Sequence, residues 1–306
     1  MRLTRRQTFL AGAALPLAAP MLSWGARPAM AQGAPAAQPL HRAFAMGDLE
    51  VVALRAGGFP NDAPHEIFGL NVDDATFAEV SAENFIPADR VFLDVTPTLV
   101  RTGSDVVLLD TGADPAGLKA ALTSAGVAPG DVTHVVLSHM HPDHIGGLSD
   151  EAGTATFPDA AYLAGQVEFD AWAAMGDELF EAKVRPFAER MTFLANDAAV
   201  APGITAIEAF GHTPGHLAFR LEGGGVQAVA TSDTANHYVW SLGHPDWEVV
   251  FDMDKETAAE TRRRVFGMIA ADRLAVVGYH MPFPGVGFVE ERGEGFRWVP
   301  ATYQFG

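Results

Sequence analysis

The stretch that decides the fold is Ser138-His139-Met140-His141-Pro142-Asp143-His144, which places three histidines and one aspartate within six residues. It directly follows the apolar run His134–Leu137, which is typical of a buried strand. In an extended segment residues i and i+2 point the same way, so His139 and His141 can bind one ion together. Pro142 turns the chain, so Asp143 and His144 can face a second ion. Imidazole and carboxylate ligands without a thiolate suit zinc or another first-row divalent ion.

Three later segments place a possible ligand at the end of an expected strand. They are Gly211-His212-Thr213-Pro214-Gly215-His216, Thr231-Ser232-Asp233-Thr234 and Val277-Gly278-Tyr279-His280. Ligands in α/β folds gather at strand ends along one edge of a sheet. We therefore expect these segments to complete the metal site.

Strand-length apolar runs and helical patterns alternate along the chain. The expected strands are Leu49–Leu54, Thr98–Arg101, Val106–Leu109, His134–Leu137, Ile204–Ile207, Leu217–Leu221, Gln227–Ala230 and Leu274–Val277. The expected helices are Pro115–Ala125, Gly165–Met175, Glu178–Leu194 and Lys255–Ala271. The alternation predicts a layered α/β sandwich with mixed sheets. Ala56–Asp94 is expected to be a long, partly irregular loop, and nothing divides residues 44–306 into two domains.

Composition and charge exclude several functions. The chain has 306 residues, 38 acidic and 20 basic side chains, a formal net charge of −18 and no cysteine. So acidic a surface repels phosphate backbones and anionic lipids, which argues against nucleic-acid binding and against membrane docking of the mature form. Without cysteine the chain has no disulfide, thiolate metal site or cysteine nucleophile.

Residues 1–31 are predicted to be a cleaved export signal. Arg5-Arg6 precedes an apolar run from Phe9 to Trp24, and Ala29-Met30-Ala31 supplies a small-residue cleavage site. The pattern Thr-Arg-Arg-Gln-Thr-Phe-Leu resembles a twin-arginine signal, which predicts a periplasmic or secreted protein. The alternatives are an ordinary secretory signal and a retained anchor. Residues 32–43 are rich in Ala, Pro and Gln and are expected to be a flexible leader.

At these motifs the chain resembles the metallo-β-lactamase fold superfamily. The His-x-His-x-Asp-His segment, the Gly-His-Thr-Pro-Gly-His turn, the later Asp and the last His follow the order of that family. The likeness is greatest to the methyl parathion hydrolase branch, in the segments Ser138–His144, Gly211–His216, His280–Gly287 and Gly295–Pro300. The resemblance covers about Gly47 to the C-terminus and implies a four-layer αββα sandwich in one domain, residues 44–306. Because members of this branch are often dimers, it also implies a possible homodimer.

The resemblance also implies the ligand set. It assigns one metal to His139, His141 and His212, the other to Asp143, His144 and His280, and a bridging role to Asp233. Asp110 matches the family's early aspartate, which supports a ligand histidine without binding a metal ion itself. The resemblance implies two divalent ions per chain, expected to be zinc, with manganese, iron or cobalt as alternatives.

The implied reaction is hydrolysis. A water shared by two such ions becomes hydroxide near neutral pH and attacks a carbonyl or phosphoryl centre, with Asp143 and Asp233 as proton acceptors. The expected substrates are aryl esters, lactones or organophosphate triesters. Two alternatives are an N-acyl homoserine lactonase and a β-lactamase-like amide hydrolase. A third, from another class, is a mononuclear iron oxidoreductase similar to persulfide dioxygenases.

Aromatic side chains are the candidates for the substrate pocket. Trp172 matches a position that lines the leaving-group pocket in the methyl parathion hydrolase branch, and Tyr238 and Trp240 follow Asp233 closely. Core packing is the alternative for all three. Lactonases of the superfamily often carry a tyrosine three residues after the bridging aspartate, and here that position is Asn236.

Overall fold

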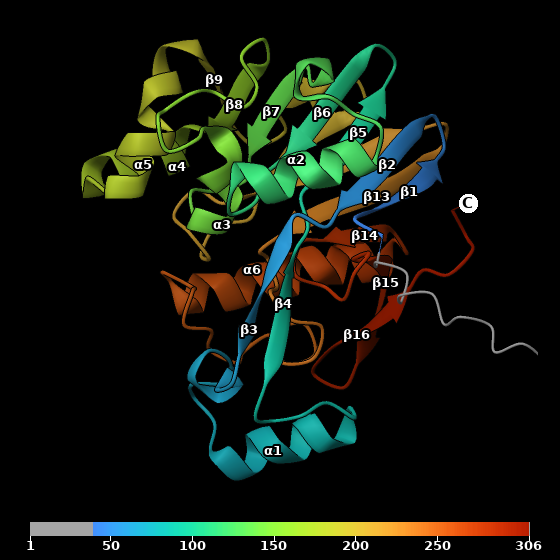
Figure 1. The fold of residues 1–306 in the computed structure, drawn as a ribbon. Helices are drawn as coiled ribbons and strands as arrows, with labels where there is room; N and C mark the ends of the chain where they lie inside the picture. Colours follow the sequence, from blue (N-terminus) through green and yellow to red (C-terminus); the bar gives the residue numbers. More distant parts are fainter. Residues whose placement is uncertain (1–38, 306) are drawn as a thin grey trace, which may run out of the picture. The chain divides into compact units, whose positions relative to one another are not determined.

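Two seven-stranded sheets stack on each other, with helices on the outer face of each (Figure 1). The structure is a computed structural model that describes residues 39–305. The export signal expected at residues 1–31 and most of the expected leader lie outside these residues. The leader would end earlier than residue 43, because the first strand already begins at His41.

The first sheet has the strand order β1-β2-β5-β6-β7-β8-β9. Its strands are β1 (His41–Met46), β2 (Leu49–Leu54), β5 (Thr98–Thr102), β6 (Asp105–Leu109), β7 (His134–Leu137), β8 (Ala161–Gly165) and β9 (Met191–Leu194). The outer face of this sheet is covered by α2 (Pro115–Ser124), α3 (Pro142–Ile145), α4 (Gln166–Met175) and α5 (Glu178–Lys183). Strands β6 to β9 run parallel, so their carboxyl ends meet at one edge.

The second sheet has the order β10-β11-β12-β13-β14-β15-β16. Its strands are β10 (Ala199–Ala201), β11 (Ile204–Glu208), β12 (Leu217–Gly223), β13 (Val226–Ser232), β14 (Ala275–Gly278), β15 (Val286–Arg292) and β16 (Gly295–Pro300). The 17-residue helix α6 (Lys255–Ala271) packs on its outer face. Strands β13 and β14 are parallel, which places the chain after each of them at the same sheet edge.

The layers explain why the central strands are apolar on both sides. In β7, Val135 and Leu137 pack toward the helices, whereas Val136 packs toward the second sheet. In β13, Ala228 and Ala230 face the first sheet, and Val229 faces the layer of α6. Because successive side chains point to opposite faces, a strand between two layers has no polar face. This arrangement confirms the αββα sandwich.

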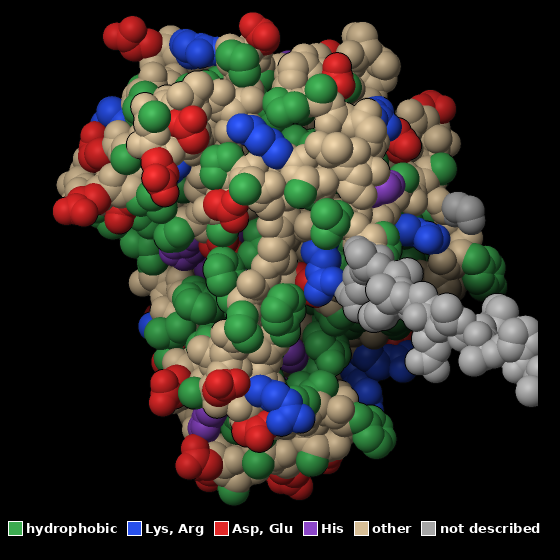
Figure 2. Space-filling model, in the orientation of Figure 1, with side chains coloured by type: hydrophobic (Ala, Val, Ile, Leu, Met, Phe, Trp, Pro, Cys, Tyr) green, Lys and Arg blue, Asp and Glu red, His purple; other side chains and the backbone are tan. Residues whose placement is uncertain are grey.

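The prediction of a long loop over Ala56–Asp94 is wrong. This segment contains β3 (Gly57–Asn61) paired with β4 (Val91–Val95), and the helix α1 (Asp74–Glu83). Asp73 caps α1 by accepting a hydrogen bond from the Thr76 N–H at 2.7 Å. The helix escaped prediction because it buries little apolar surface, chiefly Phe77, so its apolar periodicity is weak. Phe59 in β3 and Phe92 in β4 are exposed, and Figure 2 shows apolar side chains gathered over this part of the molecule.

The single helix predicted over Glu178–Leu194 is also wrong. Helix α5 ends at Lys183, a short 3-10 segment (Arg185–Arg190) follows, and Met191–Leu194 forms strand β9. Pro186 explains the break, because proline has no N–H to donate and disfavours helical geometry at the residue before it. Among residues 39–305 no helix is long and apolar enough to cross a lipid bilayer.

Candidate metal centre

The seven proposed ligands come from five places in the chain that meet at one edge of the two sheets. His139 and His141 follow β7, while Asp143 and His144 lie in the short helix α3. The second sheet contributes the others: His212 from the turn between β11 and β12, Asp233 directly after β13, and His280 two residues after β14. The structure therefore brings together residues up to 141 positions apart in the sequence.

Three ring nitrogens form a tight triangle. His141 Nδ1 lies 3.1 Å from His139 Nε2 and 3.0 Å from His212 Nε2, and the two Nε2 atoms are 3.2 Å apart. A single N–H cannot satisfy all three pairs, so lone pairs must face one another. Nitrogens bound tetrahedrally to zinc at about 2.0 Å lie about 3.3 Å apart, which matches this triangle.

A second group lies next to the triangle and is richer in carboxylates. Asp143 Oδ2 and Asp233 Oδ2 each lie 3.3 Å from His280 Nε2, and Asp233 Oδ1 lies 3.3 Å from His144 Nε2. Asp233 Oδ2 is also 3.3 Å from His212 Nε2 in the first group. Asp233 thus contacts ligands of both groups, which is the position a bridging carboxylate would need.

Two buried polar atoms support a metal at this place. His144 Nε2 and Asp233 Oδ1 are buried and 3.3 Å apart, and neither forms a hydrogen bond of good geometry within residues 39–305. Leaving such atoms unsatisfied costs free energy, and a cation between them removes that cost. Three overlapping sets of ligand atoms meet the spacing for a metal ion: His139, His141 and His212; His139, His144 and Asp233; Asp143, His144 and His280.

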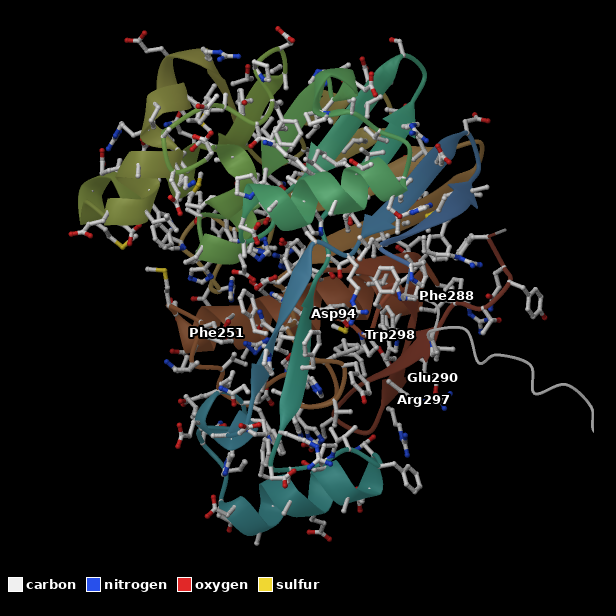
Figure 3. All side chains as sticks on the ribbon, in the orientation of Figure 1. Asp94, Phe251, Phe288, Glu290, Arg297 and Trp298 are labelled. Atoms are coloured by element: carbon white, nitrogen blue, oxygen red, sulfur yellow. The ribbon has the colours of Figure 1, made fainter. Side chains whose placement is uncertain are left out.

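Each histidine is oriented by its other ring nitrogen. His139 Nδ1 contacts Ser138 Oγ at 3.0 Å, His144 Nδ1 contacts Asp110 at 2.9 Å, and His212 Nδ1 contacts Asp252 at 2.9 Å. His280 Nδ1 contacts the carbonyl oxygen of Asp94 at 2.7 Å, and Asp94, labelled in Figure 3, belongs to β4. These partners favour the tautomer with the proton on Nδ1, so Nε2 is left free to bind a cation. His141 is the exception, because its Nδ1 faces the triangle.

Asp110, Ser138 and Ser232 form a buried polar cluster behind the two ligand groups. Ser138 Oγ lies 2.8 Å from Asp110 Oδ2 and 2.7 Å from Ser232 Oγ. Asp110 and Ser232 both adopt left-handed backbone geometry, at φ values of 64° and 43°. Such strain in residues other than glycine is concentrated at functional sites, where the surroundings fix it. Asp110 contacts His144, one of the histidines proposed as ligands, whereas no role was predicted for Ser138 or Ser232.

The electrostatics of the two ligand groups differ. Burial, together with the neighbouring imidazoles, lowers the pKa of His139 well below its ordinary value and lowers that of His141 to about 3. Burial acts in the same direction on His280, but Asp233 and Asp143 outweigh it and raise the pKa of His280 to about 10. His139 and His141 are therefore neutral imidazoles with available lone pairs, whereas the second group has two carboxylates whose negative charge would balance a dication.

Sequence reasoning missed Asp252, whereas His216 was expected to pack or to form a hydrogen bond near the site rather than to bind a metal. The Asp252 carboxylate also forms an ion pair with the buried guanidinium of Arg262. His216 Nε2 accepts a hydrogen bond from the Asp233 N–H at 3.1 Å, so it supports Asp233. Asp252 follows no strand and belongs to no short motif, so only a search for acidic residues just before the start of the expected helix Lys255–Ala271 would have suggested it.

The three aromatic residues expected at the substrate pocket lie in different surroundings. Trp172 is 8% exposed and sets its ring edge-on to His141, with ring centres 5.7 Å apart. Trp240 is 1% exposed, stacks on His237 and donates to Ser81, so its expected place in the pocket wall is wrong. It is a core residue because α1 and the segment after Asp233 close over it.

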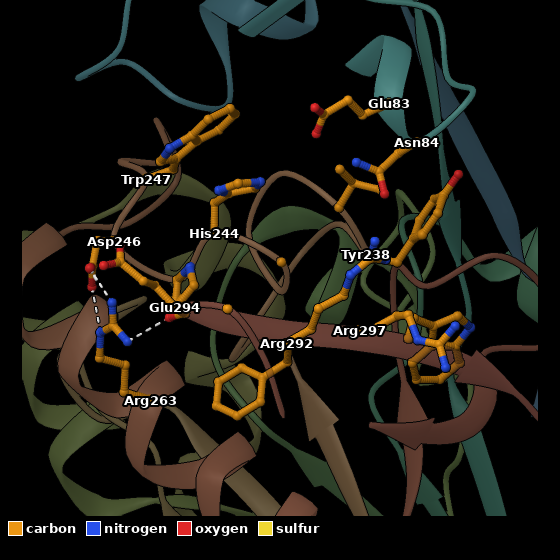
Figure 4. Close-up of a pocket in the computed structure, with 16 residues that line it drawn as sticks. Glu83, Asn84, Tyr238, His244, Asp246, Trp247, Arg263, Arg292, Glu294 and Arg297 are labelled. Carbon is orange, nitrogen blue, oxygen red and sulfur yellow. Dashed lines mark hydrogen bonds and ion pairs between the residues drawn. The ribbon is translucent and has the colours of Figure 1, made fainter. Parts of the chain in front are cut away.

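Tyr238 lines a cavity of about 650 Å³ that none of the seven ligands lines (Figure 4). Trp247 and Trp298 are also in its wall, and Arg263, paired with Asp246, lies at one side. The aromatic segment after Asp233 thus contributes to a cavity apart from the ligand groups.

Comparison with known proteins identifies the family. Residues 90–280 match the family model of the Metallo-beta-lactamase superfamily. The chain belongs to this superfamily. The matched range contains all seven proposed ligands and Asp110.

Curated relatives in this superfamily match over short stretches. The human Metallo-beta-lactamase domain-containing protein 1 is 51% identical over 59 residues, which are 19% of this chain and 20% of the relative. An N-acyl homoserine lactonase from Bacillus sp is 28% identical over 101 residues, which are 33% of this chain and 37% of the relative. The chain thus matches 20% to 37% of the length of these relatives.

Solved structures of the superfamily share the fold over nearly their full length. AidC, described as a dizinc quorum-quenching lactonase in complex with a product, superposes with a TM-score of 0.79 at 24% identity, covering 87% of this chain and 99% of AidC. The hydrolase AbOPH superposes with a TM-score of 0.78 at 23% identity, covering 86% and 98%. At this identity the likeness shows the fold, and the likeness to the methyl parathion hydrolase branch stays a prediction.

Proposed function

We propose that this chain is a metal-dependent hydrolase that binds two divalent ions and cleaves ester-type bonds in aryl esters, lactones or organophosphate triesters. The observation that carries the proposal is the convergence of five imidazole nitrogens and two carboxylates, with His144 Nε2 and Asp233 Oδ1 buried and unsatisfied between them. Zinc is the metal that best suits nitrogen and carboxylate ligands at this spacing, and manganese, iron and cobalt are the alternatives.

The ligand groups leave one side of the centre open. His139, His144 and His212 are buried, whereas the Asp143 side chain is 18% exposed and His141 is partly exposed. A substrate would therefore approach past His141 and Asp143. Two divalent ions, when bound, polarise the scissile bond and lower the pKa of a water toward neutrality.

Asp143 and Asp233 are the proton acceptors in this proposal. Burial would raise the pKa of Asp143, but the neighbouring His144 and His280 outweigh it and lower that pKa to about 2. The carboxylate is therefore ionised at neutral pH, and it is the more solvent-accessible of the two. Asp143 can take a proton from the attacking water and give it to a leaving group, while Asp233 is held by the His216 contact and by Asn236.

Exposed apolar side chains next to Asp252 favour a substrate ester that carries an apolar aryl or acyl group. Val250, Phe251 and Met253 are 49%, 39% and 47% exposed, and they flank Asp252, whose carboxylate holds His212. The Met253 N–H donates to the carbonyl oxygen of His212 at 3.0 Å, so this segment lies against a ligand. Apolar surface this close to the centre would gain free energy by covering an apolar part of the substrate.

A lactone is the second candidate within the ester class, because AidC and the Bacillus protein are both named as lactonases. Asn236 concerns this candidate because it stands where lactonases of the superfamily often carry a tyrosine. Its side-chain amide donates to Asp233 Oδ2 at 2.8 Å, so it is occupied with the bridging carboxylate and does not replace a tyrosine that would contact the substrate.

Metal analysis combined with an activity panel tests the proposal. Elemental analysis should find about two zinc-type ions per chain, and the loaded protein should cleave at least one of an aryl ester, a lactone and a phosphotriester. A β-lactam in the same panel tests the amide alternative. One iron per chain with oxidation of a persulfide would instead support the mononuclear oxidoreductase.

We also propose that the chain is exported to the periplasm or beyond by a twin-arginine signal. The support is the Arg5-Arg6 pair, the apolar run and the Ala29-Met30-Ala31 site, all of which lie outside the residues that the structure describes. A pathway that exports folded proteins would let the metal ions be bound before export.

A further inference from the structure

We infer that Glu168 is a positioning residue that fixes the His139–His141–His212 triangle by joining the two chain segments that carry it. This inference rests on the proposed function, because it assigns the triangle to a metal ion. Glu168 lies in the first turn of α4 and is fully buried.

Four donors from three segments converge on this carboxylate. Oε1 accepts from the Met140 N–H at 3.1 Å and from the Trp172 Nε1–H at 2.6 Å. Oε2 accepts from the Thr213 hydroxyl and from the Gly215 N–H, both at 2.8 Å.

The partners are neighbours of the ligands in the sequence. Met140 lies between His139 and His141, and Thr213 directly follows His212. One oxygen therefore holds the segment after β7, and the other holds the turn before β12. The two segments are about 70 residues apart in sequence, yet their ring nitrogens must stay within a few tenths of an ångström of a metal-binding arrangement.

Only a carboxylate can accept all four hydrogen bonds. It has two oxygens with about four lone-pair positions, whereas glutamine has one acceptor oxygen and one donor amide. None of the four partners carries a charge, and burial raises the pKa of Glu168. The position at the N-terminal turn of α4 partly offsets the cost of burying the carboxylate.

Trp172 connects this carboxylate to the open side of the centre. Its indole N–H is held by Oε1, and its ring stands edge-on to His141. Glu168 thus fixes the Trp172 ring beside His141, the most exposed ligand of the triangle. It also fixes the chain at Met140 and at Gly215, next to the ligands of the triangle.

The variant Glu168→Gln tests the inference through metal binding. Its amide group would turn toward Thr213, whose hydroxyl can accept, and the Gly215 N–H would lose its partner. We expect the affinity for one of the two zinc ions to fall about 10- to 100-fold in competition with a chromogenic chelator. The other ion should stay bound with near-native affinity, because Asp143, His144 and His280 make no contact with Glu168.

A second readout separates positioning from general stability. The rise in melting temperature when zinc is added to the metal-free protein should be smaller in Glu168→Gln than in the native chain, because weaker binding gives less stabilisation. The matched control is Ser81→Ala on helix α1, an element that carries none of the proposed ligands, and it removes the acceptor of the buried Trp240 indole. That control should lower the melting temperature of metal-free and zinc-loaded protein equally.

Thr213→Val keeps the test decisive if Glu168→Gln does not fold. It removes one of the four hydrogen bonds and keeps the volume of the side chain, so we expect a smaller loss of zinc affinity in the same direction. Native affinity for both ions in either folded variant overturns the inference about Glu168. If the native chain itself binds no pair of zinc ions, the proposed function fails instead, so the two failures are distinguishable.

Discussion

Asp252 accepts a hydrogen bond from His212 Nδ1 at 2.9 Å, although it lies 40 residues further along the chain and in a different segment. Its other oxygen pairs with the buried guanidinium of Arg262 on α6. Burial alone would raise the pKa of Asp252, but the bond from His212 and the charge of Arg262 keep it below its ordinary value. Helix α6 is thereby connected to a proposed ligand through two buried side chains.

Arg262→Met should therefore destabilise the protein strongly. It leaves the Asp252 carboxylate buried without its cation, a loss of about 3 to 5 kcal/mol. The adjacent Arg263→Met is the matched control, because Arg263 pairs with a half-exposed Asp246 and should cost at most about 1 kcal/mol. Urea unfolding of both variants measures the difference, and equal losses would contradict a special role for the buried pair.

Removing the metal ions should lower thermal stability without unfolding the chain. The imidazoles and carboxylates that face one another in the centre lose their shared cation, while the apolar layers on both sides of each sheet are untouched. Because ions bind only the native state, each restored zinc ion adds about 3 to 4 kcal/mol when free zinc is 100 to 1,000 times the Kd of its site. Calorimetry before and after dialysis against a chelator checks this, and an unchanged melting temperature would count against a metal centre.

His141→Ala and Asp233→Ala should each abolish turnover in a chain that stays largely folded. The first removes a corner of the nitrogen triangle, and the second removes the carboxylate that contacts both ligand groups. Activity is measured on protein whose metal content is known, with circular dichroism as the check on folding. A native kcat in either metal-loaded variant would refute the assignment.

Gly211→Ala should displace His212. Gly211 has a φ of 118°, and a Cβ there would lie 2.2 Å from the backbone nitrogen of Ala258 in α6. The control is Gly126→Ala, because Gly126 also has a positive φ, at 69°, but has open space around it. Gly126→Ala should cost about 1 kcal/mol of stability and keep zinc binding, whereas Gly211→Ala should lose both stability and zinc. Equal zinc affinities in the two variants would show that the close approach of Gly211 to α6 is not needed to position His212 for zinc binding.

Replacing Arg5 and Arg6 together by lysine should leave the precursor in the cytoplasm. The twin-arginine pathway reads that pair, whereas an ordinary secretory signal needs only positive charge. Fractionation followed by immunoblotting measures the result. A periplasmic yield equal to that of the native chain would favour the ordinary secretory route.

The local chemistry could be predicted from the sequence because it depends on short spacings. The strand at His134–Leu137 and the helix at Lys255–Ala271 have the predicted bounds, since both carry strong apolar patterns. The segment from His139 to His144 indicates metal binding because i and i+2 spacing and a proline turn are properties of neighbouring residues. Prediction failed at helix α1, because its apolar pattern is weak. It also failed over Glu178–Leu194, because the single residue Pro186 ends a helical pattern.

Only the tertiary structure decided how the distant residues meet. The sequence alone determined the apolar layers, the ligand types and their likeness to a family, because each is carried by residue type and short-range order. The contacts of Asp252 with His212, of Ser232 with Ser138 and of Glu168 with both ligand segments arise from strand order and helix packing. No local pattern encodes these contacts, because they depend on which sheet edges are brought together when the two halves of the sandwich bury their apolar faces.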